Sequence, residues 1–304
     1  MQRNVAILIV LTAAAGATWA WRLSQEKPVV TAPPPPELAI PDFEAETQVR
    51  TVEDVHRLRA QLIREVFGGE LPTGRELVRA SILPADKPSR SLAIYHGGHK
   101  QVAEEAFGAR ALQSAGYDVL AISMLPGVYH ERIDGEPYPL RRFLEPVALG
   151  LNYALEQKAY DEVIMVGLSG GGWTTVVYAA MDPRIQRSYQ IAGSLPEYLR
   201  QFVPHSIGDH EQSLPGLSMG YIDLYLMAAS EGREQFQVLV RHDPCCFPGD
   251  LAHTYRPFVE KRAAELGGQF GLVVDELDQH DISPTMARLL WGASAPHREA
   301  TGDR

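Results

Sequence analysis

Residues 162–172 read EVIMVGLSGGG, and they are the most informative part of the sequence about its architecture. Its first part, 162–166, is a short apolar run typical of a buried strand. The run passes directly into the pattern G-x-S-x-G, formed here by Gly167, Ser169 and Gly171, and an apolar helical segment follows. A strand, a tight glycine turn and a helix lift a serine side chain above the end of a sheet. The stretch therefore predicts that Ser169 is a nucleophile.

Each residue type in this turn has a chemical reason. A serine hydroxyl is a weak nucleophile and must project to where a base can reach it. Glycines two positions on either side let the turn close without a Cβ clash. The helix begins beneath the serine, so the amide of Gly170 faces developing negative charge. A phosphate-binding loop is the alternative, but G-x-G-x-x-G is absent and no Lys-Ser or Lys-Thr pair follows.

Strand-like and helix-like segments alternate on both sides of this turn. We expect strands at 77–83, 91–95, 117–124, 162–166, 188–192, 237–240 and 271–276, and helices at 55–67, 103–114, 146–157, 255–266 and from the glycine turn to 181. The alternation predicts an α/β fold with a mostly parallel twisted sheet and helices on both faces. Residues 193–236 interrupt the rhythm with three prolines and several aromatic residues, which indicates a cap-like insertion over one end of the sheet.

A second glycine turn, His96-Gly97-Gly98-His99, follows the strand expected at 91–95. Acyl transfer needs two donors aimed at the oxyanion, and a turn of this kind lets the backbone come close. We expect the amide of Gly98 to join that of Gly170 in an oxyanion hole, with His99 as the neighbouring alternative. An ordinary glycine turn is the structural alternative. A metal pair of His96 and His99 is disfavoured, because no further ligand has suitable spacing.

With these two turns in this order, the chain resembles the α/β-hydrolase family over residues 51–291. In that family the catalytic acid follows the next-to-last core strand and the histidine follows the last. The resemblance implies Asp243 as the acid and His280 as the base.

Rival assignments stay open at this point. Asp243-Pro244 also fits an Asx turn, while Asp250 and Asp223 are alternative acids. His280 has the polar neighbours of a surface-loop histidine.

The chain has two cysteines, Cys245 and Cys246, directly after Asp243 and Pro244. They exclude a disulfide-rich scaffold and a thiolate-rich metal site. Adjacent Cα atoms lie about 3.8 Å apart, below the usual disulfide range of about 4.4–6.8 Å. A strained vicinal disulfide and two free, half-buried thiols therefore both stay open. A bridge would brace the loop that presents Asp243.

The composition limits the classes of partner. The 304 residues carry 28 Lys and Arg against 38 Asp and Glu, a net charge of −10, which argues against a nucleic-acid partner. Residues 5–21 carry no charge, and residues 33–36 are four prolines. We expect a signal anchor or signal peptide at 1–24, a Pro-rich linker at 25–50, a hydrolase domain at 51–292 and a polar tail at 293–304. The expected location is exported and membrane-anchored, facing the periplasm or the extracellular side, with cleavage and secretion as the alternative.

Together these features predict a serine hydrolase that cleaves an ester, less favourably an amide, through an acyl-enzyme. The expected substrate is a small-molecule acyl ester, without a cofactor, a metal or a protein partner. His99, Tyr221 and Tyr225 are expected to contact it. A non-catalytic, envelope-tethered binding domain and a serine peptidase are the alternatives, because one fold hosts many functions.

Overall fold

The computed structural model describes residues 38–126, 135–202, 210–214 and 216–292. The chain divides into two units, Met1–Ala39 and Ile40–Arg304, and the fold below is that of the second. The charge-free run at 5–21 lies outside the described residues. Within the described part, no helix has the length and apolar character needed to cross a membrane. Export and anchoring therefore stay predictions from the sequence.

In the described part of the chain, seven strands form one sheet in the order β1-β3-β2-β4-β5-β6-β7. They are β1 Ala80–Leu83, β2 Ser91–His96, β3 Asp118–Ile122, β4 Glu162–Leu168, β5 Arg187–Ile191, β6 Glu234–Val240 and β7 Gln269–Asp275. The pair β1 and β3 is antiparallel, and the other neighbours are parallel. Every strand overlaps one predicted from the sequence, so the mostly parallel α/β fold is confirmed.

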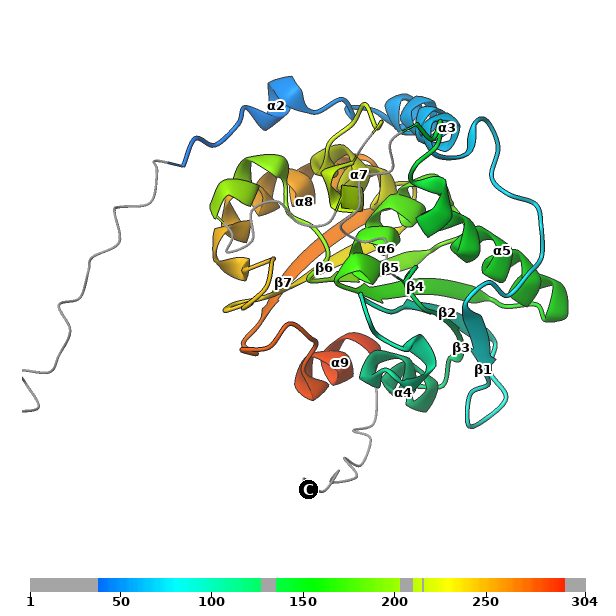
Figure 1. Ribbon diagram of the computed structural model, residues 1–304. Coiled ribbons are helices and arrows are strands. Elements are labelled where there is room, and N and C mark those ends of the chain that lie inside the picture. The colour runs from blue at the N-terminus through cyan, green and yellow to red at the C-terminus, as the bar shows by residue number, and fades with distance from the viewer. Residues whose placement is uncertain (1–37, 127–134, 203–209, 215, 293–304) are drawn as a thin grey trace, which may run out of the picture. The chain divides into compact units, whose positions relative to one another are not determined.

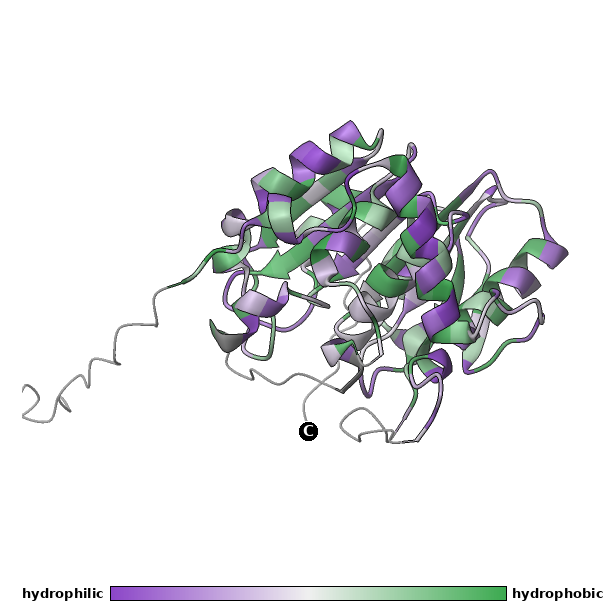
Figure 2. Ribbon diagram, turned by 90° about the horizontal axis from the view of Figure 1, so that it is seen from above, coloured by the Kyte–Doolittle hydropathy of each residue, from purple (hydrophilic) through white to green (hydrophobic). Residues whose placement is uncertain are grey.

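Helices cover both faces of the sheet (Figure 1). One face carries α4 Phe107–Ser114 and α9 Pro284–Trp291, and the other carries α3 Val52–Phe67, α5 Arg141–Gln157, α6 Gly170–Met181, α7 Tyr221–Ala228 and α8 Arg256–Glu265. All residues of α6 are buried, because α3, α5 and α7 pack around it against the sheet. Figure 2 shows mainly hydrophobic strands between helices of mixed character. The core therefore lies between the sheet and its two helical layers.

Short elements complete the fold. They are the helix α2 Phe43–Glu46 and the 3-10 helices η1 Ala103–Glu105, η2 Glu197–Phe202, η3 His210–Ser213 and η4 Gly249–Thr254.

The predicted linker ends at residue 50, which is too late. Val49 is fully buried, and the backbone amides of Gln48 and Val49 donate to the Asp223 carboxylate at 2.8 and 3.0 Å. A buried aspartate that caps these amides cannot be anticipated from a proline-rich composition. Residues 43–49 thus belong to the compact unit.

The predicted cap-like insertion also reaches too far. Its second half contains α7, which packs between α6 and α8 as part of the outer layer, and β6 begins at Glu234. Of the predicted insertion, the described residues that lie between β5 and α7 are 193–202, 210–214 and 216–220.

The helix predicted to begin at Pro146 begins at Arg141. Proline inside a helix lacks the N–H that would bond to the carbonyl four residues earlier, here that of Arg142. This carbonyl accepts instead from Nη2 of Arg79 at 3.5 Å. A side chain from the start of β1 therefore occupies the position that the proline leaves open.

His96, at the end of β2, is buried, and its Nδ1–H donates to the carbonyl of Gly97 at 2.9 Å. Burial lowers its pKa from 6.5 to about 4. The folded protein therefore keeps this imidazole neutral at pH values at which the unfolded chain protonates it.

We predict that this difference destabilises the protein in mild acid. As the pH falls from about 6.5 to about 4, His96 becomes protonated in the unfolded chain but stays neutral in the folded protein. This difference lowers the free energy of unfolding by up to about 1.4 kcal/mol per pH unit. Urea denaturation across this range should give a flatter pH dependence for His96→Gln than for the parent. The control His253→Gln, at an exposed histidine, should keep the parental slope. Equal slopes for the parent and His96→Gln would contradict the prediction.

Candidate active site

Ser169 occupies a sharp turn between β4 and α6, with φ +57° and ψ −121°. A residue other than glycine with positive φ is strained and persists only where its surroundings hold it. Here the amide of Ser169 donates to the carbonyl of Ile191 at 2.8 Å, and its carbonyl accepts from Trp173 at 3.0 Å. The half-buried serine is therefore pinned to both β5 and α6 at the carboxyl edge of the sheet.

The glycines of the motif have a steric cause. A Cβ on Gly167 would stand 2.0 Å from the carbonyl oxygen of Gly171, and one on Gly171 would stand 2.1 Å from the carbonyl oxygen of His96. No side chain fits at either position without moving backbone. The pattern G-x-S-x-G thus reflects contacts between β4, α6 and the end of β2.

The structure brings together the predicted acid and base. Asp243 follows β6 and His280 follows β7, and the two strands are paired at their carboxyl ends. Nδ1 of His280 lies 2.8 Å from Oδ2 of the buried Asp243 carboxylate. The other ring nitrogen, Nε2, is buried and has no hydrogen-bond partner among the described residues. The imidazole is thus held on one side and available on the other, at the sheet edge where Ser169 lies.

Three backbone amides hold the Asp243 carboxylate. Cys245 and Cys246 donate to Oδ1 at 2.7 and 3.2 Å, and Phe247 donates to Oδ2 at 3.2 Å. Burial raises the pKa of Asp243, but the hydrogen bond and charge of His280 and these amides outweigh it, so the pKa lies below its ordinary value. The group therefore stays a carboxylate and holds a proton on Nδ1 of His280.

Cys245 and Cys246 form a disulfide with each other. Of the two states that the sequence leaves open, the structure contains the bridged one. Since both cysteine amides bond to Asp243, the bridge lies in the loop that presents the acid.

The rival acids have other partners. Asp250 is exposed and pairs with Arg241 at 3.0 Å. Asp223 caps the amides of residues 48 and 49. Neither bonds to His280 in the described structure.

Of the two amides expected to form the oxyanion hole, that of Gly98 differs from the prediction. Gly170 begins α6, where a helix leaves its first amides without acceptors. Gly98 lies against the nucleophile, because a Cβ on it would stand 3.1 Å from Cβ of Ser169. Its amide, however, donates to Oε1 of Gln101 at 3.2 Å, and the same oxygen accepts from the hydroxyl of Tyr95 at 3.0 Å. The Gly98 amide is therefore engaged in this conformation, by a glutamine that the sequence analysis does not single out.

Of the three expected substrate contacts, His99 lies beside Gly170, the residue after the nucleophile. A Cβ on Gly170 would stand 2.8 Å from Cε1 of His99, so this ring borders the first turn of α6.

The expected role of Tyr225 is wrong. Its side chain is fully buried, with its hydroxyl 2.8 Å from Oγ of Ser194 and its ring stacked on Phe270. Tyr225 therefore packs in the core and has no surface for a substrate.

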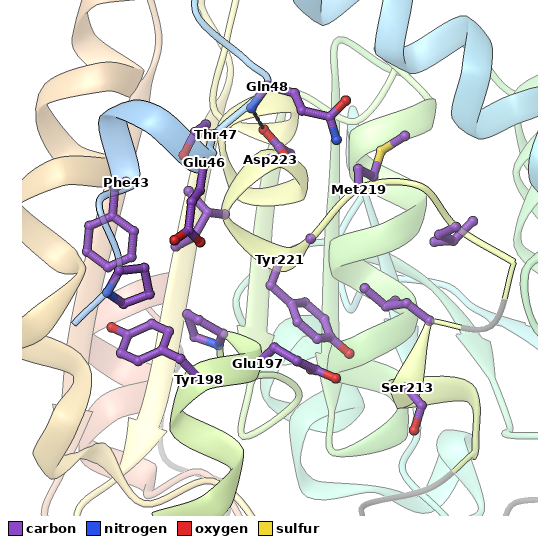
Figure 3. Close-up of a pocket in the computed structure, with 16 residues that line it drawn as sticks. Phe43, Glu46, Thr47, Gln48, Glu197, Tyr198, Ser213, Met219, Tyr221 and Asp223 are labelled. Carbon is purple, nitrogen blue, oxygen red and sulfur yellow. Dashed lines mark hydrogen bonds between the residues drawn. The ribbon is translucent and has the colours of Figure 1, made fainter. Parts of the chain in front are cut away.

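Tyr221 lines a cavity of about 520 Å³ between α2, η2 and the start of α7 (Figure 3). Phe43, Glu46 and Tyr198 also line it, whereas Ser169, Asp243 and His280 are not among the described residues of its wall. Figure 3 shows the ring of Tyr221 among these side chains and the Gln48 amide bonded to Asp223. A role for Tyr221 beside the nucleophile is therefore not supported.

Comparison with known proteins gives similarity in structure alone. No model of a known protein family and no curated protein sequence matches the chain. Among 617 similar chains of solved structures, Methylesterase BT1017 has a TM-score of 0.52 at 15% identity, over 81% of this chain and 63% of its own. Est1E from Butyrivibrio proteoclasticus has a TM-score of 0.47 at 14% identity, over 66% of this chain and 84% of its own. An acylaminoacyl peptidase from Pyrococcus horikoshii has a TM-score of 0.46 at 13% identity, over 70% of this chain and 36% of its own.

At such identities the likeness to the methylesterase concerns the fold. It agrees with the strand order, the single antiparallel pair β1 and β3, and the strand-turn-helix at Ser169. The chain has the α/β-hydrolase fold.

Proposed function

We propose that this protein is a serine hydrolase that cleaves an ester bond through an acyl-enzyme. Ser169 is the nucleophile, His280 the general base and Asp243 the acid that orients it. One observation carries the proposal: Nδ1 of His280 is bonded to a buried carboxylate, while its buried Nε2 lacks a partner among the described residues. Such an imidazole is prepared to accept a proton from a neighbouring hydroxyl.

The proposed reaction has two stages. Nε2 of His280 takes the proton of the Ser169 hydroxyl while Oγ attacks the ester carbonyl, and the Asp243 carboxylate stabilises the imidazolium that forms. The same proton passes to the leaving alkoxide as the C–O bond breaks. Water then attacks the acyl-enzyme, gives its proton to Nε2 and releases the acid, with the proton returning to Ser169.

The oxyanion would be stabilised by the amide of Gly170, at the positive end of α6. The amide of Gly98 is the second proposed donor. It would serve only after Oε1 of Gln101 gives way, with the substrate oxygen replacing it as acceptor.

An ester is proposed ahead of an amide. Methylesterase BT1017, whose fold is similar, is named for activity on an ester. Aminoacyl amides and short acyl esters, assayed side by side, separate an esterase from a peptidase.

The direct experiment is labelling with a fluorophosphonate probe. The parent protein should form a covalent adduct, and Ser169→Ala should not, because the attacking oxygen is gone. The variant should also lose about 10⁴-fold or more in kcat on a 4-nitrophenyl ester. Labelling that persists in Ser169→Ala would refute the assignment, and a parent that neither labels nor turns over esters would favour a binding domain.

Asp243→Asn tests the acid. An amide cannot stabilise the imidazolium and favours the wrong tautomer, so kcat should fall by about 10³- to 10⁴-fold. The matched control is Asp250→Asn, at an exposed carboxylate bonded to Arg241, which should stay within about two-fold of the parent. Loss of turnover in the control variant alone would show that the acid is misassigned.

The disulfide in the loop after β6 leads to a further prediction about kcat. Reduction of the Cys245–Cys246 bridge frees the loop whose amides hold Asp243, so kcat should fall by roughly ten-fold, the effect of losing about one such hydrogen bond. The double variant Cys245→Ser/Cys246→Ser should show the lower kcat at once and should not respond to reductant. If reductant lowers the activity of this double variant equally, the bridge is not the cause.

A further inference from the structure

A second cavity, of about 650 Å³, adjoins the proposed nucleophile. It lies where the loop after β2, the start of β1 and the end of β3 meet, and its wall includes Arg79, Lys100, Gln101, Glu104 and Met124. The reaction proposed above gives Arg79 no chemical role.

The cavity shares residues with the catalytic turn. Cε of Met124 would lie 2.5 Å from a Cβ on Gly170. Gln101 holds the amide of Gly98, which in turn lies against Ser169. A molecule in this cavity therefore contacts two residues, Gln101 and Met124, that border the catalytic turn. This is the basis for placing part of an ester substrate in it.

Arg79 is the most informative residue of the wall. Its side chain is half-buried, and its Nε is buried without a hydrogen-bond partner in the described part of the chain. Its Nη2 reaches the carbonyl of Arg142 at a long 3.5 Å, and it forms no ion pair with a described carboxylate. Burial lowers the pKa of Arg79, with no carboxylate to raise it. A partly buried guanidinium that forms no ion pair with a described carboxylate can donate to an anion through its terminal nitrogens, since Nε itself has almost no accessible surface.

Two other charged side chains belong to the described wall of the cavity. Lys100 stands at the exposed rim, and Glu104 is the carboxylate among the described lining residues.

We propose that this cavity binds a carboxylate of the substrate, with Arg79 as the main donor and Lys100 at the rim. The inference rests on the proposed esterase function and narrows its substrate class to esters that carry a carboxylate. Planar, bidentate pairing favours a carboxylate on a guanidinium. A neutral ester leaves the guanidinium unpaired, so the same contact discriminates against it.

The test compares matched esters that differ in one charge. In the acyl arm, mono-4-nitrophenyl glutarate is compared with its neutral primary amide, and in the alcohol arm 4-acetoxybenzoate is compared with 4-acetoxybenzamide. The parent should favour the anion in at least one arm by about ten-fold in kcat/KM, the usual effect of one charge-assisted hydrogen bond. Arg79→Gln should abolish this preference, measured as the ratio of kcat/KM for the anionic ester to that for its neutral partner.

Arg75→Gln is the matched control, because it removes an equal charge from an exposed arginine paired with Glu156. It should keep the preference. If Arg79→Gln does not fold, Lys100→Gln should still lower the preference by about three-fold, since a rim charge contributes less. A parent without preference in both arms, or equal losses in the Arg79 and Arg75 variants, would overturn the inference.

Binding separates this inference from the proposed function. Calorimetric titration of Ser169→Ala with glutarate and with 4-hydroxybenzoate needs no catalysis. Binding of either anion that weakens about ten-fold on adding Arg79→Gln supports the site even if no ester is turned over. Ester turnover without anion preference, together with binding unchanged by Arg79→Gln, overturns the site and leaves the esterase proposal intact.

Discussion

The close approach of two backbone segments at Gly167 and Gly171 is the constraint on which the structure around Ser169 depends. With 2.0 Å between a virtual Cβ of Gly167 and the carbonyl oxygen of Gly171, only glycine lets α6 begin directly above β4. The turn requires a strained backbone at Ser169, which has a positive φ. Hydrogen bonds from this residue to β5 and α6 hold it in that conformation. The bend brings the hydroxyl to the carboxyl edge of the sheet, where the loops after β6 and β7 also arrive.

A buried charge, the Asp243 carboxylate, lies at the same edge of the sheet. Asp243 is nearly inaccessible to water, and a lone carboxylate there would be expensive. Three amides and the imidazole of His280 provide the compensation, so the acid remains charged and the histidine keeps one orientation. The Cys245–Cys246 bridge lies within this loop, which links the covalent state of the chain to the geometry of the proposed base.

A helix irregularity connects the scaffold with the proposed specificity. Pro146 leaves the carbonyl of Arg142 without its helical donor, and Arg79 reaches it from the start of β1. Arg79 also lines the cavity beside the catalytic turn, and its Nε is unpaired among the described residues. A local defect in α5 and a cation near the nucleophile are therefore parts of one arrangement.

The strands and the glycine turn could be predicted from the amino-acid sequence, because short-range periodicity carries that information. Asp243 and His280 were implied by the resemblance to a family, with rival acids open until the structure showed the two side chains bonded to each other. Three findings required the folded structure: Tyr225 is a core residue, Gln101 accepts from the amide of Gly98, and residues 43–49 belong to the compact unit. These outcomes arise from contacts between segments distant along the chain, which burial and hydrogen-bond satisfaction select and no local pattern records.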